Sequence, residues 1–128
     1  EVIETADVVS CHMPYTKENH HIINKDVFAR MKKTAYFVNV ARGPIMNEKD
    51  LIDACRNHVI RGAATDVYEN EPVICDEITK LDNIVLSPHI GSNVYEARRG
   101  MAEEAMDGSL AVLAGEKPHN IVNPQVLG

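Results

Sequence analysis

The sequence has few cysteines, and no two of them lie close together in the chain. The three cysteines lie at positions 11, 55 and 75, without a C-x-x-C motif. An odd number of such thiols does not form a disulfide framework, and two of them lie inside apolar segments. We therefore expect reduced cysteines in a cytoplasmic protein.

Long apolar runs and clusters of positive charge are also absent. No stretch approaches the roughly 18 apolar residues that a membrane-spanning helix requires, and no signal peptide is visible. The 13 lysines and arginines are scattered through a chain whose formal net charge is −6 at pH 7. No basic stripe can therefore follow a phosphate backbone. We expect neither a membrane nor a nucleic acid as a partner.

The residues that are present suit a small globular domain. Of the 128 residues, 45% are hydrophobic and 25% are charged, which is enough apolar surface for a buried core. Four short apolar runs that end in special residues predict strands, at residues 7–14, 35–43, 60–72 and 83–91. Apolar and polar residues do not alternate strictly within them, which is typical of parallel strands covered on both faces.

Two helix patterns lie between these strands. Asn24 can cap a helix over residues 25–33, and Asn47 can cap one over residues 48–57. Alternating strands and helices predict an α/β fold, with an open parallel sheet, right-handed crossovers and flanking helices. The opening segment EVIETAD looks like the end of a helix that leads into the first strand, so we expect the chain to start in the middle of a fold.

A longer helix is predicted over residues 94–114, which are rich in alanine, methionine and glutamate. Gly100 and Gly108 each weaken such a helix by about 1 kcal/mol relative to alanine, a loss that close packing against another element usually offsets. Gly115 is expected to end the helix, and residues 116–128 are expected to form an extended arm. The predicted parts of the chain are residues 1–93 and residues 94–128.

Chemically reactive residues collect where the predicted strands end. In open parallel sheets, ligands bind in the crevice beyond the carboxyl ends of the strands. The residues expected there are Pro14, Arg42, Asp66, Glu71 and His89. Taken singly, each has a structural alternative, such as a surface ion pair for Arg42 or a solvated turn for Glu71. Together, at successive strand ends, they predict an active site.

A metal site is the competing interpretation of the other histidines. Its ligands would be Cys11, His12, His20 and His21. Neighbouring strand residues such as Cys11 and His12 point to opposite faces of a sheet, which spoils the ligand geometry. We therefore predict no metal site.

Three sequence blocks carry a family resemblance, and a fourth extends it. VNVARGPIMNEKDLIDA, GAATDVYENEP and NIVLSPHIGS are similar to the signature blocks of the NAD-dependent D-isomer-specific 2-hydroxyacid dehydrogenases, as is ADVVSCHMPYTKENHHIIN. The blocks stand in the family's order and spacing and cover essentially the whole chain. The resemblance implies the second half of a Rossmann-like NAD-binding domain, followed by a helix that returns to a flavodoxin-like substrate domain.

The resemblance also assigns catalytic roles. Arg42 would bind the carboxylate of a 2-oxo acid with its planar guanidinium and polarise the carbonyl. His89 would protonate the carbonyl oxygen during reduction and accept the proton during oxidation. Glu71 would favour the charged imidazole and fix its orientation. Gly43 would let the chain turn closely beneath the substrate and the cofactor.

The cofactor implied by the resemblance is NAD, with NADP not excluded. The residues expected to contact it are Met13, Pro14, Asn19, Val40, Ala41, Arg42, Asp66, His89 and Gly91. Within this set, Asp66 would bind the carboxamide, whereas Pro14 and Asn19 have turn formation alone as an alternative. Tyr68 stands where the family more often has phenylalanine, a change that keeps an aromatic ring and is not expected to disturb the function.

Parts that a complete enzyme of this family needs are missing from the sequence. No G-x-G-x-x-G occurs, so the phosphate-binding turn is absent, together with the acidic residue that binds the ribose. The substrate domain is absent as well. We expect a segment of a longer chain that is inactive, or nearly so, alone. The sequence does not decide which small 2-oxo or 2-hydroxy acid is the substrate, and a homodimer is expected from the resemblance only.

The alternative function is a binding protein. Transcriptional corepressors of the C-terminal binding protein type resemble the same family and use dinucleotide binding to control protein assembly. Absence of turnover on every 2-oxo acid, together with NADH-dependent dimerisation, would favour this alternative.

Overall fold

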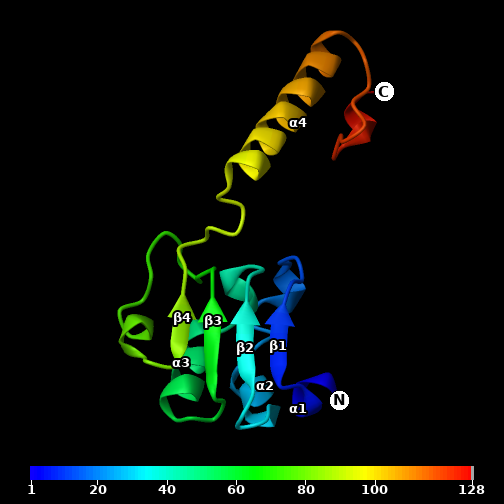
Figure 1. The fold of residues 1–128 in the computed structure, drawn as a ribbon. Helices are drawn as coiled ribbons and strands as arrows, with labels where there is room; N and C mark the ends of the chain where they lie inside the picture. The colour runs from blue at the N-terminus through cyan, green and yellow to red at the C-terminus, as the bar shows by residue number, and fades with distance from the viewer. Residues whose placement is uncertain (128) are drawn as a thin grey trace. The chain divides into compact units, whose positions relative to one another are not determined.

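Four parallel strands form one sheet in the computed structural model, which describes residues 1–127 (Figure 1). In chain order and side by side, they are β1 (Val8–Cys11), β2 (Tyr36–Asn39), β3 (Gly62–Thr65) and β4 (Ile84–Leu86). The register pairs Val8 with Tyr36, and Tyr36 with Gly62. The predicted parallel sheet is confirmed, although each strand is shorter than its apolar run because the following residues turn into loops.

Short helices precede β1 and connect the strands. The elements are α1 (Val2–Thr5), α2 (Lys25–Arg30), α3 (Glu48–Arg56) and the 3₁₀ turns η1 (Lys17–Asn19), η2 (Gly43–Ile45) and η3 (Ile78–Lys80). Both predicted caps are confirmed. The Asn24 side chain accepts hydrogen bonds from the amides of Asp26 and Val27, and the Asn47 side chain accepts one from Asp50 at 3.0 Å. These bonds satisfy amide groups that the start of a helix leaves without an intrahelical partner.

Helix α2 ends at Arg30, so the predicted helix over residues 25–33 was wrong at its carboxyl end. Met31 has an extended backbone, with φ −73° and ψ 157°, and its side chain is buried. Lys32 forms an ion pair with Asp7, with 2.9 Å between Nζ and Oδ1. The extended backbone at Met31 ends the helix because it places the Met31 side chain in the core and directs the chain toward β2.

The core lies between the sheet and helices α2 and α3. Phe28 of α2 and Phe37 of β2 are fully buried and meet edge to face, with ring centroids 5.4 Å apart. Leu51 and Cys55 of α3 belong to the same core. Burial raises the pKa of the Cys55 thiol to about 11, so this cysteine stays protonated and unreactive near neutral pH.

The opposite face of the sheet is bare within residues 1–91, which corrects the prediction that both faces are covered. Val8 is 57% exposed and Val85 is 71% exposed, and burial alternates along β1, β2 and β4. Right-handed connections that always advance in one direction place their helices on one face of a sheet. The strands here follow chain order, so α2 and α3 lie on the same side (Figure 1).

The residues from Ser92 onward form a second compact unit, separate from Glu1–Gly91. Its main element is α4 (Tyr95–Leu113), which matches the predicted long helix. Gly115 ends the helix with φ +75°, as predicted. The amide of Gly115 bonds to the carbonyl of Val112, and that of Glu116 bonds to Ala111, which is the Schellman arrangement of a helix end.

The tail after α4 has more structure than the extended arm that its sequence predicted. It turns back along α4 and includes the short η4 (Pro124–Leu127), while Asn120 donates a hydrogen bond to Glu104 at 2.9 Å. A Cβ atom on Gly108 would lie 3.2 Å from the Asn120 side chain, whereas one on Gly100 would meet nothing within 4 Å. Only Gly108 therefore has the packing partner that was predicted for both.

No helix within residues 1–127 is both long enough and apolar enough to cross a membrane.

The one-sided core predicts very different effects of truncating the two faces of the sheet. Phe37→Ala should lower the free energy of unfolding by about 3–5 kcal/mol, because it leaves a cavity in the core. Val85→Ala, on the bare face, should change it by less than about 0.5 kcal/mol. Urea unfolding of the 128-residue chain measures both. Equal losses would contradict the one-sided arrangement.

Candidate active site

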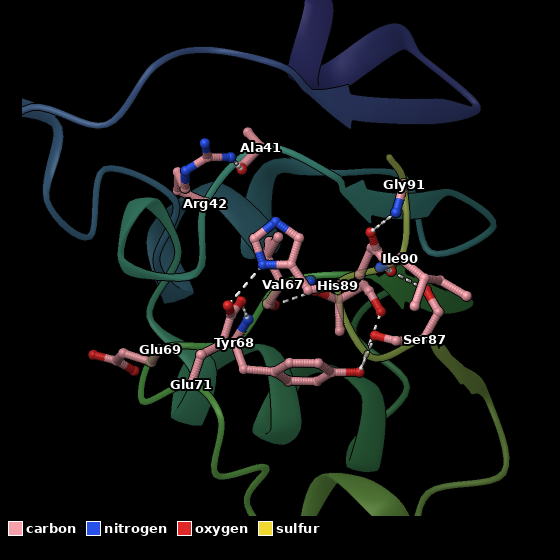
Figure 2. A network of polar contacts seen from close by, with 12 residues as sticks. Ala41, Arg42, Val67, Tyr68, Glu69, Glu71, Ser87, His89, Ile90 and Gly91 are labelled. Carbon is pink, nitrogen blue, oxygen red and sulfur yellow. Dashed lines mark hydrogen bonds and ion pairs between the residues drawn. The ribbon is translucent and has the colours of Figure 1, made fainter. Parts of the chain in front are cut away.

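Three loops at the carboxyl ends of β2, β3 and β4 bring the predicted catalytic residues to one edge of the sheet. The loop after β2 carries Arg42, the loop after β3 carries Asp66 and Glu71, and the segment after β4 carries His89. Parallel strands end at the same edge, so these loops become neighbours (Figures 1 and 2).

Glu71 and His89 form a directly bonded pair. The Nδ1 atom of His89 lies 2.7 Å from Oε2 of Glu71 (Figure 2). An ionised carboxylate only accepts hydrogen bonds, so Nδ1 carries the proton in this pair. The second ring nitrogen, Nε2, is turned away from Glu71 and is the atom that can exchange a proton with a ligand.

The other oxygen of Glu71 is also held. Its Oε1 accepts a hydrogen bond from the amide of Tyr68 at 2.9 Å. Burial opposes ionisation of Glu71, but the hydrogen bonds from His89 and Tyr68, together with the positive charge of Arg42, outweigh it and lower the pKa of the carboxyl. Glu71 is therefore ionised near neutral pH and suited to favour a charged imidazole.

Asp66 anchors the segment that carries His89. Its Oδ1 accepts hydrogen bonds from the Ser87 hydroxyl at 2.6 Å and the Ile90 amide at 3.0 Å, and its Oδ2 accepts one from the Gly91 amide at 3.0 Å. Burial opposes ionisation, yet these bonds outweigh it and lower the pKa of Asp66. His89 has φ +53°, a backbone conformation unusual for a residue with a side chain. The carboxylate thus holds a strained segment, an internal role that the sequence did not predict.

Gly43 brings the loops after β2 and β3 into contact. A Cβ atom at this position would lie 1.9 Å from the carbonyl oxygen of Tyr68 and 2.6 Å from the amide nitrogen of Glu69. Gly43 was predicted to let the chain turn closely beneath a substrate and a cofactor; the groups that its missing side chain accommodates are backbone atoms of Tyr68 and Glu69. The adjacent Arg42 is exposed, and its Nη1 donates to the carbonyl of Ala41 at 2.6 Å.

A cleft of about 640 Å³ lies between the loops after β1 and β2. Its lining residues are His12, Met13, Pro14, Tyr15, Val40, Ala41, Arg42 and Pro44. Five of the residues predicted to contact the cofactor are among them. The cleft combines apolar walls with one cationic side chain, which fits a group that has a planar ring and an anionic part.

Asn19 has a different position from these lining residues. Its Nδ2 donates to the carbonyl of Pro14 at 2.7 Å, and its Oδ1 accepts from the amide of Thr16 at 2.8 Å. Both bonds shape the loop after β1, which favours the alternative of turn formation for this residue.

Tyr68 makes a hydrogen bond that was not predicted from the sequence. Its hydroxyl donates to the carbonyl of Ser87 at 2.9 Å (Figure 2), so it links the loop after β3 to the end of β4. A phenylalanine would lack this bond.

Within residues 1–127, no group of three or more histidine, cysteine or carboxylate side chains is arranged to hold a metal ion.

Comparison with known proteins gives this geometry a family. Residues 1–91 match the D-isomer specific 2-hydroxyacid dehydrogenase, NAD binding domain. A glyoxylate reductase of Thermofilum pendens is 48% identical over 127 residues, which make up 98% of this chain and 38% of that protein. The resemblance predicted from the sequence blocks is therefore confirmed.

Two solved structures extend the comparison. An NADPH-dependent glyoxylate/hydroxypyruvate reductase from Sinorhizobium meliloti, in complex with NADP and malonate, has a TM-score of 0.89 and 28% identity over 96% of this chain and 39% of that one. A D-lactate dehydrogenase from Lactobacillus jensenii with NAD+ has a TM-score of 0.86 and 28% identity over 94% and 41%. The Rossmann-like fold and an NAD-type cofactor are confirmed. The chain spans only about two fifths of the length of these relatives.

The contact at Gly43 predicts a strong effect of a single methyl group. Gly43→Ala should lower the free energy of unfolding by at least about 2 kcal/mol, because the new Cβ collides with the Tyr68 backbone. Gly100→Ala is the matched control and should raise helix stability by about 0.5–1 kcal/mol, since nothing stands near that position. Urea unfolding followed by circular dichroism measures both variants. A neutral Gly43→Ala variant would contradict the close approach of the two loops.

The lowered pKa of Asp66 predicts a dependence on pH. A carboxyl whose pKa is lower in the folded state stabilises the fold above its unfolded pKa of about 3.9, and this stabilisation is lost as the pH falls through the folded value. Asp66→Asn should therefore cost about 2 kcal/mol at pH 6, and the difference from wild type should shrink below about pH 4.

Unfolding curves between pH 6 and pH 3 test this dependence. Asp82→Asn is the control, because Asp82 is exposed and makes no hydrogen bond within residues 1–127. A difference between wild type and Asp66→Asn that stays constant over this range would show that the carboxylate charge does not hold the segment.

Proposed function

Because this chain belongs to the D-isomer specific 2-hydroxyacid dehydrogenases, we propose that it forms part of an oxidoreductase that interconverts a small 2-oxo acid and its D-2-hydroxy acid. The observation that carries this proposal is the Glu71–His89 pair, which lies at the same sheet edge as Arg42. A proton-transfer group with its orienting carboxylate and a separate carboxylate-binding cation are the groups this chemistry requires.

Arg42 binds the substrate carboxylate in this proposal. A guanidinium has five N–H donors in a planar fork, and the bond to Ala41 involves only Nη1. The remaining donors can hold a carboxylate through charge-assisted bonds of about 1.5–3 kcal/mol each. This arrangement orients the 2-oxo acid and polarises its carbonyl group.

His89 moves the proton. When bound, NAD(H) supplies the hydride for the C2 carbon of the oxo acid or accepts it from the hydroxy acid. As the carbonyl oxygen gains negative charge, Nε2 of His89 donates its proton to it, and in the reverse direction Nε2 accepts the proton from the hydroxyl group. The Glu71 carboxylate on Nδ1 favours the imidazolium and keeps Nε2 pointing at the substrate.

The cofactor would lie along the cleft after β1 and β2. The residues proposed to hold it are Met13, Pro14, Val40, Ala41 and Arg42, which line that cleft. His89 and Gly91 do not line it and would lie nearer the reacting end of the cofactor. Asp66 and Asn19 contribute indirectly, because their polar atoms position the segments that carry these residues. The bonds of Asp66 to the Ile90 and Gly91 amides support a positioning role over direct binding of a carboxamide.

We propose further that catalysis needs more chain than these 128 residues. The chain has no G-x-G-x-x-G turn for the pyrophosphate, and it spans 38% of the glyoxylate reductase that it resembles. The proposed organisation is a partial NAD-binding domain over residues 1–93 and a helix with its tail, over residues 94–128, that returns to a substrate domain. A cytoplasmic location and a homodimer remain predictions.

Turnover by the full-length protein tests the proposed function. NADH and NADPH oxidation should be measured with glyoxylate, pyruvate, hydroxypyruvate and a branched 2-oxo acid. His89→Ala should lower kcat by about 10²–10⁴-fold, because the general acid is lost. His119→Ala is the matched control, since His119 also pairs with a glutamate, Glu104 at 2.9 Å, but lies in the tail after α4. This control should keep wild-type turnover.

Two results would count against the proposal. A His89→Ala variant that retains turnover within about tenfold of wild type would remove the histidine from the chemistry. Measurable NADH binding without turnover on any 2-oxo acid would favour the alternative of a dinucleotide-sensing binding protein.

A further inference from the structure

We propose that His21 is a positioning residue for the reaction: its imidazole holds the carboxylate of Glu69 and thereby sets the turn that presents Glu71 to His89. This inference rests on the proposed function, because the position of Glu71 affects turnover only if His89 transfers a proton. His21 lies outside the cleft and 48 positions before Glu69 in the chain, so its role depends entirely on the fold.

The imidazole of His21 is held on several sides. Its Nε2 bonds to Oε1 of Glu69, and its Nδ1 lies 3.4 Å from the side-chain amide of Asn47. The ring of His20 stacks on it with 3.8 Å between centroids. The backbone of His21 has φ +53°, and its amide donates to the carbonyl of Pro44 at 2.9 Å. An unusual backbone conformation and four contacts thus aim one ring nitrogen at one carboxylate.

Glu69 in turn is locked to the start of α3. Its Oε2 accepts a hydrogen bond from the amide of Glu48 at 3.3 Å, and Oε2 of Glu48 accepts one from the amide of Glu69 at 3.2 Å. Glu48 is only 8% exposed. Two carboxylates that meet in a partly buried place repel each other unless hydrogen-bond donors compensate. His21 is the side chain that supplies such a donor to Glu69.

Glu69 is the neighbour of Tyr68, whose backbone amide orients Glu71. The Tyr68 amide, which donates to Glu71, immediately precedes Glu69 in the chain. Glu69 and Glu71 point to opposite sides of this turn, Glu71 toward His89 and Glu69 away from it (Figure 2). We expect a shift of the Glu69 backbone to be passed to the neighbouring Tyr68 amide, which holds the carboxylate of Glu71.

The same lock also sets the position of the loop after β2. The backbone of Gly43 lies against Tyr68 and Glu69, and the His21 amide is bonded to Pro44. Arg42 precedes this loop contact directly. His21 thus contacts both the loop that carries Arg42 and the turn that carries Glu71. The proposed reaction requires a fixed distance between these two parts.

Kinetics of the full-length protein test this role. His21→Ala should lower kcat at least about tenfold, because a displacement near 1 Å in a catalytic group can cost up to about 10²-fold. The Kd for NADH should stay within about twofold of wild type, because the bond from His21 to the cleft-lining Pro44 comes from the backbone amide, which the substitution keeps. His21→Gln keeps an N–H donor of similar reach and should restore kcat to within about threefold of wild type.

His58→Ala is the control for backbone effects. His58 also has a left-handed backbone, with φ +50°, but it is exposed at the end of α3 and its ring makes no hydrogen bond within residues 1–127. Removing a histidine from such a conformation should alone leave kcat unchanged. If His21→Ala behaves like His58→Ala, or if His21→Gln loses as much kcat as His21→Ala, the positioning role is refuted.

Amide hydrogen exchange gives a readout that does not depend on turnover. Exchange of the Tyr68 amide should accelerate at least about tenfold in His21→Ala and return toward wild type in His21→Gln, because the bond to Glu71 loosens only in the former. Unchanged exchange in His21→Ala would overturn the inference. If the wild type turned over no 2-oxo acid, the proposed function would fail, whereas the exchange result would still decide whether His21 holds the turn.

Discussion

A close approach between two loops, at Gly43 and Tyr68, determines the geometry of the site. The absence of a side chain at position 43 lets the loop after β2 lie directly on the loop after β3. Arg42 precedes this contact, and the turn that leads to Glu71 follows it. The distance between the backbone segments that carry Arg42 and Glu71 is therefore set by a contact between backbone atoms, which vary less in position than long side chains do.

Two carboxylates, those of Asp66 and Glu69, hold segments that the contact between Gly43 and Tyr68 does not fix. Asp66 accepts three hydrogen bonds and holds the strained segment of His89, while Glu69 takes a bond from His21 and is locked to the first turn of α3. His21 and His89 both have a positive φ, a conformation that costs about 1–2 kcal/mol in a residue with a side chain. Such strain persists only where surrounding bonds over-determine it, and here it directs two imidazoles at two glutamates.

The sheet explains why these loops meet at all. Four strands that follow chain order with right-handed connections put α2 and α3 on one face and leave Val8, Tyr36 and Val85 on the other. All connections after the strands emerge at one edge, where Arg42, Glu71 and His89 collect. The one-sided core thus stabilises the sheet through Phe28, Phe37 and α3, while the edge remains open for a ligand.

Local features of this protein were determined by the sequence itself. The caps at Asn24 and Asn47 and the helix end at Gly115 depend on bonds between residues two to five positions apart, so their signals lie in short stretches. The places of Arg42, Glu71 and His89 at strand ends also follow from short apolar runs, and the family blocks supplied roles for them. Gly43 was singled out as well, although the backbone that it accommodates was not identified.

Only the tertiary structure decided which groups meet. The early end of α2 depends on the burial of Met31, and the bare sheet face depends on the direction in which three connections advance. Asp66 bonds to Gly91 across 25 positions, and His21 bonds to Glu69 across 48. Periodicity and capping signals extend over a few residues, whereas these contacts arise from the way in which parallel strands align their ends. No local pattern specifies them, because they belong to the packing of loops that the sheet brings together.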